Sequence, residues 1–108
     1  MSVQSETMED GDNGKETGMT KTLMVGYDLN KSGQNYDKLI EALKAYGTYW
    51  HHLDSTWLIR TTKTCVEVRD ELKTHIDSND ELLVTELSGA AAWAGFNETG
   101  SKWLKEHL

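Results

Sequence analysis

Asp28 is the residue of this chain best placed to do chemistry. It ends the apolar run from Thr22 to Tyr27 and is followed by the polar loop Leu29–Gln34. The run reads as a central strand that delivers the Asp28 carboxylate to an edge of the sheet. Gly26 removes a side chain where a ligand or another backbone could approach. An acid at a strand end is also a common turn-former or helix cap, and that interpretation stays open.

Two adjacent histidines, His51 and His52, could supply acid–base chemistry near neutral pH. Neighbouring residues on a strand point to opposite faces, so the two rings do not easily share one metal ion. One of them, taken here as His52, is the candidate catalytic acid or base on the face of Asp28. A structural role for each histidine stays open.

Other motifs with a known chemistry are absent from the sequence. It has no glycine-rich phosphate loop, no zinc-ligand spacing and no nucleophile elbow. The four tryptophans could stack on bases, but they also suit core and dimer contacts.

Length and composition indicate one modest domain. The chain has 108 residues, 37% of them hydrophobic, and no apolar run approaches the roughly 18 residues of a membrane span. No apolar segment follows a basic start, so we expect no secretory signal and a cytoplasmic location. The single cysteine, Cys65, cannot form an internal disulfide, which agrees with that compartment.

The net charge of −7 is concentrated at the start of the chain. Residues 1–19 hold five acids and one lysine, a composition typical of disorder, so we expect a disordered acidic tail over residues 1–20. The domain then spans residues 21–108. An acidic body argues against broad, sequence-independent binding of duplex nucleic acid, because that affinity comes mainly from neutralising phosphates.

The elements needed to position Asp28 can be read in order. A strand ending at Asp28 precedes an amphipathic helix over about residues 36–46, with Asn35 as its expected cap and Gly47 as its stop. Residues 48–53 and 55–61 predict a tight β-hairpin. Thr64 and Glu67 match a capping box that begins a second helix, and residues 81–87 predict a fourth strand.

This order of strand, helix, strand, strand, helix and strand is the ferredoxin-like βαββαβ arrangement of the α+β class. It predicts a four-stranded antiparallel sheet with both helices on one face and the first and third strands in its centre. From about residue 88 the chain exceeds this unit, and residues 101–108 look like a short helix. The uncovered sheet face needs either this C-terminal segment, with Trp93, Phe96, Trp103 and Leu104, or a second subunit.

Three stretches carry a family resemblance. They are Met24–Asp28, a helix ending in Tyr46-Gly47, and Ser55–Ile59. In these stretches the chain resembles the small CRISPR-associated endoribonuclease that is also the scaffold subunit of spacer-integration complexes. The chain also resembles virulence-associated protein D, a related ribonuclease toxin. It is most similar to small bacterial and phage proteins called SinR-like, which share the Tyr27–Asn30 and His51–Trp57 stretches. The resemblance covers roughly residues 22–87.

The resemblance implies a homodimer whose sheets pack face to face. The Asp28 carboxylates of the two subunits would then meet around a divalent metal, Mg²⁺ or Mn²⁺, that activates water against an RNA phosphodiester. Magnesium commonly uses only one or two carboxylates, together with water and substrate phosphate. By position, Ser55 matches a serine near that carboxylate. The relatives carry arginines near the site, whereas the loop after Asp28 offers Lys31 and the third strand offers Arg60. The candidate substrate-binding residues are Tyr27, Asn30, Lys31 and Arg60.

Three functions stay open on the sequence. The first is a metal-dependent endoribonuclease. The second is a catalytically inactive module that binds or assembles with a protein partner, in which Asp28 and Ser55 only hold the sheet together. The third is a binder of small nucleotides in phage defence or counter-defence.

Overall fold

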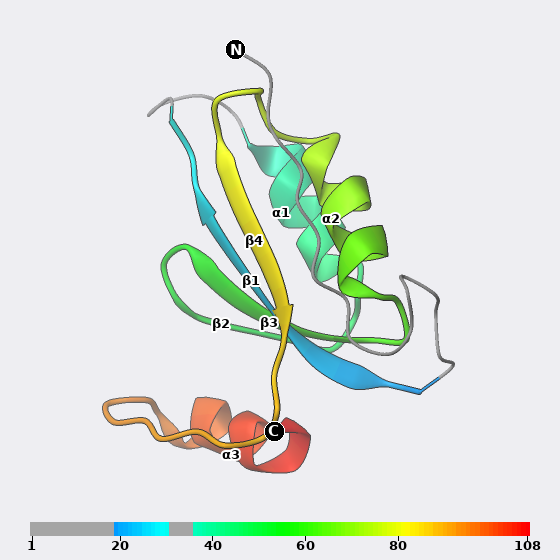
Figure 1. Ribbon diagram of the computed structural model, residues 1–108. Coiled ribbons are helices and arrows are strands. Elements are labelled where there is room, and N and C mark those ends of the chain that lie inside the picture. Colours follow the sequence, from blue (N-terminus) through cyan, green and yellow to red (C-terminus); the bar gives the residue numbers. More distant parts are fainter. Residues whose placement is uncertain (1–18, 31–35) are drawn as a thin grey trace.

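The computed structural model describes residues 19–30 and 36–108 of the chain. Residues 1–18 of the predicted acidic tail lie outside the described residues, as do Lys31 and the predicted helix cap Asn35. Four strands and three helices follow one another (Figure 1). They are β1 (Lys21–Asp28), α1 (Asp37–Lys44), β2 (Tyr49–Leu53), β3 (Thr56–Thr61), α2 (Cys65–Lys73), β4 (Glu81–Glu86) and α3 (Glu98–His107).

The strands form one antiparallel sheet in the order β2-β3-β1-β4. Val25 in β1 lies opposite Trp57 in β3 and opposite Val84 in β4. The α+β class and the four-stranded antiparallel sheet are therefore confirmed, with β1 and β3 as the central pair. Asp28 is the last residue of β1, as predicted.

One face of the sheet carries α1 and α2, which lie side by side (Figure 1). Side chains at alternate positions of β1 and β3 point to this face, because successive residues of a strand alternate. They pack against helix residues spaced four apart, which share one side of a helix. The fully buried members of this core are Leu23, Val25, Leu39, Leu43, Trp57, Ile59, Val68 and Leu72. Burying each such side chain contributes about 1.5–3 kcal/mol.

The predicted capping box and glycine turn are both present, although α1 ends at Lys44, two residues before its predicted end. Thr64 accepts a hydrogen bond from the backbone N–H of Glu67, and the Glu67 carboxylate accepts one from the backbone N–H of Thr64. This capping box satisfies two N–H groups that the first turn leaves free. After α1, Gly47 takes φ of +89°, a left-handed conformation that favours glycine and turns the chain towards β2.

The C-terminal segment covers part of the opposite face of the sheet. Leu104 of α3 is buried with Trp50 and Leu58, and the partly buried residues Met24, Trp93, Phe96 and Trp103 pack against them. The predicted role of this segment as a cover is therefore confirmed for this part of the face. The helix begins at Glu98, three residues before the predicted start, because Asn97 caps it by accepting the backbone N–H of Gly100.

A polar cluster on the helix layer joins α1 to α2. The Tyr46 hydroxyl and the Lys63 ammonium donate to the two carboxylate oxygens of Glu71, at 2.8 and 2.7 Å. Burial and the neighbouring Glu71 raise the pKa of the Tyr46 hydroxyl. Burial raises the pKa of the Glu71 carboxyl, but the hydrogen bonds from Lys63 and Tyr46 outweigh it, so the net pKa lies below its usual value. Within the described ranges, no helix has the length and apolar character needed to cross a membrane.

Candidate functional site

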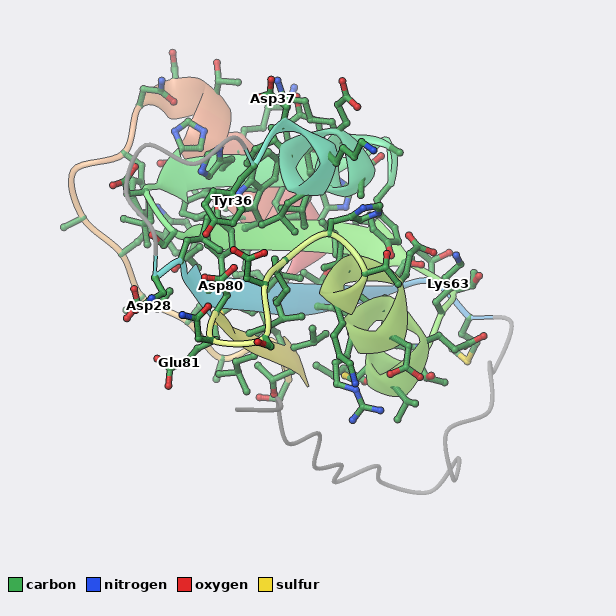
Figure 2. The ribbon with its side chains drawn as sticks, turned by 90° about the horizontal axis from the view of Figure 1, so that it is seen from above. Asp28, Tyr36, Asp37, Lys63, Asp80 and Glu81 are labelled. Carbon is green, nitrogen blue, oxygen red and sulfur yellow. The ribbon has the colours of Figure 1, made fainter. Side chains whose placement is uncertain are left out.

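Asp28 and Glu81 face one another at the end of the sheet. Asp28 pairs with Glu81, the first residue of β4, and both residues are exposed. Directly opposed residues on antiparallel strands have Cβ atoms roughly 4.5–5.5 Å apart. Figure 2 shows both side chains at one end of the sheet, near Asp80 and Tyr36, with Lys63 at the other end. The pairing of β1 with β4 therefore places a second carboxylate, Glu81, beside Asp28, the one predicted from the sequence.

Neither carboxylate is neutralised within the described part of the chain. No described residue forms an ion pair or a side-chain hydrogen bond with Asp28 or Glu81. Like charges directly opposite one another on a sheet destabilise the fold. Two opposed carboxylates at an exposed strand end offer the oxygen ligands that a hard divalent cation prefers.

The donor set fits a loosely held magnesium or manganese ion better than a fully enclosed one. No group of three or more His, Cys, Asp or Glu residues among those described is arranged to hold a metal ion. Asp28 and Glu81 are two carboxylates, the number that magnesium commonly takes from a protein before water and substrate phosphate complete its shell. The two residues therefore fit such an ion, and a symmetric pair of chains would bring four carboxylates.

Ser55 lies close to the end of β1. Its carbonyl accepts a hydrogen bond from the backbone N–H of Tyr27 at 3.1 Å, one residue before Asp28. Ser55 is exposed in the two-residue turn between β2 and β3. The structure thus brings Ser55 and Asp28 to the same end of the sheet.

Tyr27 points to the other face of the sheet. Its hydroxyl accepts a hydrogen bond from the Trp57 indole N–H at 3.1 Å, and its side chain packs against the core under α1 and α2. Asp28 is its neighbour in β1, so its side chain points away from that core. The sheet therefore separates Tyr27 from the exposed face of Asp28.

Asp80 holds the loop that follows Asp28, and the sequence did not single it out. This carboxylate is 3% exposed, and one of its oxygens accepts the backbone N–H of Asn30 at 2.7 Å and the hydroxyl of Tyr36 at 3.2 Å. The other oxygen accepts the backbone N–H of Asp77 at 2.8 Å. Asp80 thus fixes the backbone of Asn30, two residues after Asp28, and the structure shows this backbone contact rather than one from the Asn30 side chain. Asp80 belongs to the turn Asp77-Ser78-Asn79-Asp80 before β4, but Asn30 and Tyr36 lie 50 and 44 residues away from it in the sequence.

Arg60 is placed at the opposite end of the central strands. It pairs with Thr22, six residues from Asp28, which corresponds to roughly 20 Å along a strand. Its guanidinium donates to the Thr22 hydroxyl at 2.7 Å and to the carbonyl of His107 at 3.5 Å, and the Thr22 hydroxyl also donates to that carbonyl. A cation beside the last carbonyls of a helix is favourable. Arg60 therefore anchors the end of α3 and does not share a site with Asp28 within one chain.

The two histidines lie on β2, two strands away from β1. The His51 ring stacks on Trp57, with centroids 3.9 Å apart. The His52 ring lies against Gly100 of α3, where an added Cβ would come within 2.9 Å of it. The small residue at position 100 thus lets α3 approach β2, and His52 occupies that contact.

The part of the sheet face beside Asp28 is open. Gly26 lies opposite Thr56 and Leu83, and Thr56 in turn lies opposite Leu53, so these four residues form a row across all four strands. An added Cβ on Gly26 would meet no atom within 4 Å. At the ends of the row, Leu53 is 48% and Leu83 57% exposed. We call this row, from Leu53 through Thr56 and Gly26 to Leu83, the open row.

The structure thus gathers Asp28, Ser55 and Glu81 at one end of the sheet, with the backbone of Asn30 nearby. It places Tyr27 on the other face, Arg60 at the other end and His52 on the edge strand. Lys31 lies outside the described residues. Comparisons of the chain with protein-family models and with solved structures gave no match.

Proposed function

We propose that this chain is a cytoplasmic, ferredoxin-like homodimer that hydrolyses RNA phosphodiesters with the help of Mg²⁺ or Mn²⁺. The observation that carries the proposal is the pair of exposed, uncompensated carboxylates Asp28 and Glu81 at the end of β1 and β4. The strand order β2-β3-β1-β4, with α1 and α2 on one face, supports the ferredoxin-like arrangement.

The open row supports the homodimer. Two exposed leucines flank the small residues Thr56 and Gly26, so a second copy could approach the sheet closely between them. A two-fold axis presents the same patch from both chains, so each leucine contributes twice to the interface. Asp28 lies on the same face as Gly26, two residues along β1, so such contact brings the two Asp28 side chains near one another.

Asp28 and Glu81 would hold the cation in this proposal. A bound divalent cation lowers the pKa of a water molecule and offsets the charge that develops on a phosphate. The role of the two carboxylates is to hold the cation at the strand end, while Asp80 holds the backbone of the following loop in place. Ser55, beside Tyr27 in the hairpin turn, is the hydroxyl available at the same end.

A catalytically inactive assembly module is the second candidate, and the placement of Arg60 favours it. A nuclease needs cations to hold phosphate, and Arg60 is engaged with Thr22 and the end of α3. The dimer through the open row is common to both candidates. They differ only in whether the carboxylate pair acts on RNA.

Ribonuclease assays separate the two candidates. We expect the wild-type protein to cleave single-stranded or structured RNAs with Mg²⁺ or Mn²⁺ but not with chelator, and Asp28→Asn to lose at least about a hundredfold in rate, because the amide removes the charge that holds the cation. Glu81→Gln should lose less, because it keeps Asp28, the carboxylate that the proposed dimer brings near its counterpart in the second chain. Asp70→Asn, on the exposed side of α2, is the matched control and should keep wild-type activity. Equal background cleavage by wild type and Asp28→Asn would favour the assembly module.

A further inference from the structure

A cavity of about 330 Å³ lies beyond the outer edge of β2 and has no part in the site at Asp28. Lys44 of α1 lines one side of it, and Thr99 and Trp103 of α3 line the other. Because α1 and α3 pack on opposite faces of the sheet, a cavity that both line must lie past its edge. β2 is the edge strand on this side.

The wall formed by β2 presents aromatic rings in a fixed arrangement. Tyr49 is 37% exposed, and its ring lies 5.2 Å from that of the fully buried Trp57. The exposed His51 ring is stacked nearly parallel on Trp57, at an interplanar angle of 14°. His51 Nε2 lies 3.0 Å from the carbonyl of Asp54, and since a carbonyl only accepts, this nitrogen carries the hydrogen. Trp57 therefore holds one side of the His51 ring in place. The other side of that ring can stack on a further planar group with little loss of side-chain entropy.

The charge of the lining selects for an anion. Lys44 and the histidines His51 and His52 line the cavity, and none of its lining residues is acidic, although the chain has 18 acids and 11 bases. Lys44 forms no ion pair with any described residue. A second cavity, of about 480 Å³ between α1 and the end of α2, is by contrast lined by three acids, Asp37, Glu41 and Asp77.

We propose that the cavity beside β2 binds a planar heteroaromatic ring that carries a phosphate, as in a nucleoside monophosphate. The ring would stack on Tyr49 and His51, with Trp103 on the other side, and the phosphate would meet Lys44. The volume lies at the lower end of the range of small-ligand pockets, which suits a single nucleotide. Such a ligand is either a free mononucleotide or the end of an RNA strand. This inference does not depend on the hydrolysis proposed at Asp28.

Calorimetric titration of the full chain in chelator tests the proposal. We expect adenosine and uridine monophosphates to bind with a dissociation constant on the order of 100 µM, given the usual affinity per atom of small ligands. Adenosine without phosphate, and inorganic phosphate alone, should each bind at least about tenfold more weakly, because each keeps only half of the contacts. Equal binding of adenosine and its monophosphate, or no binding of any nucleotide at millimolar concentration, would overturn the proposal.

A 5′-phosphorylated trinucleotide distinguishes the two sources of the ligand. Binding about tenfold tighter than the mononucleotide would assign the site to the end of an RNA strand, because base stacking adds with each nucleotide. Equal or weaker binding would assign it to the free nucleotide. Either result supports a nucleotide site at β2.

Two variants locate the binding at this cavity. Lys44→Gln and Tyr49→Leu should each weaken monophosphate binding about tenfold, through loss of the phosphate contact and of the stacking surface. Lys38→Gln, in the same helix but at the acidic second cavity, is the matched control and should bind as wild type does. Asp28→Asn should also bind normally, which separates this test from the ribonuclease assay. Wild-type affinity in Lys44→Gln, an exposed position whose change leaves the fold intact, would contradict the assignment.

Discussion

Asp80→Ala is expected to lower the free energy of unfolding by about 3 kcal/mol, because hydrogen bonds to a charged group contribute about 1.5–3 kcal/mol each and the Asp80 side chain that accepts them is buried. The carboxylate accepts from the backbone of Asn30, the hydroxyl of Tyr36 and the backbone of Asp77. These residues belong to the loop after β1, the start of α1 and the turn before β4. Urea denaturation followed by circular dichroism measures the change, which corresponds to roughly 15 °C in melting temperature.

The conservative variant and a neighbour sharpen this test. Asp80→Asn should lose about half as much, because the amide keeps one oxygen acceptor but turns an N–H group towards a donor. Ser78→Ala changes an exposed residue of the same turn and should stay within about 0.5 kcal/mol of wild type. If Asp80→Ala were as stable as Ser78→Ala, Asp80 would not be the link between the loop and the turn.

Leu83→Glu is expected to convert the proposed dimer into a monomer. Leu83 is 57% exposed at one end of the open row. A two-fold axis would place two new carboxylates in the interface, where burying an unpaired charge is costly. We expect the dissociation constant of the dimer to rise at least about a hundredfold, or about 2.7 kcal/mol. Light scattering at micromolar concentration should then give the mass of one chain for the variant and twice that mass for wild type.

The fold of the variant should survive, because the side chain at position 83 is already in water in the single chain. Ala45→Glu adds the same charge at an exposed position on the helix layer and is the matched control, so it should remain a dimer. A wild-type protein with the mass of one chain would refute the dimer. A Leu83→Glu protein that stays dimeric would move the interface away from the open row.

Local sequence signals predicted most of the fold. The Thr64–Glu67 capping box fixes the start of α2 through its own side chains, so four consecutive positions suffice to recognise it. Gly47, three residues after the end of α1, marks the turn towards β2 because its left-handed conformation favours glycine. Trp57 and Ile59 alternate with Leu58 along β3, and the structure buries the first two under α1 and α2 and Leu58 against α3.

The candidate site was less predictable because its members meet through long-range contacts. Glu81 joins Asp28 only through the register of β1 with β4, and a one-residue slip would turn it to the other face. Asp80 has partners 44 and 50 residues away in the chain, so its turn motif gave no sign of them. Arg60 has the right chemistry for phosphate, but the strand pairing places it at the far end of the sheet.

Thermal melting of wild type and Asp28→Asn, each with chelator and with Mn²⁺, tests the carboxylate pair most directly. Without metal, Asp28→Asn should melt at or above the wild-type temperature, because it relieves the repulsion between Asp28 and Glu81. Mn²⁺ at about ten times its dissociation constant should raise the wild-type midpoint by roughly 5 °C, through preferential binding to the folded state, and leave the variant unchanged. An Asp28→Asn protein that melts several degrees lower, with no effect of Mn²⁺ on either protein, would show that Asp28 is only a turn-forming residue.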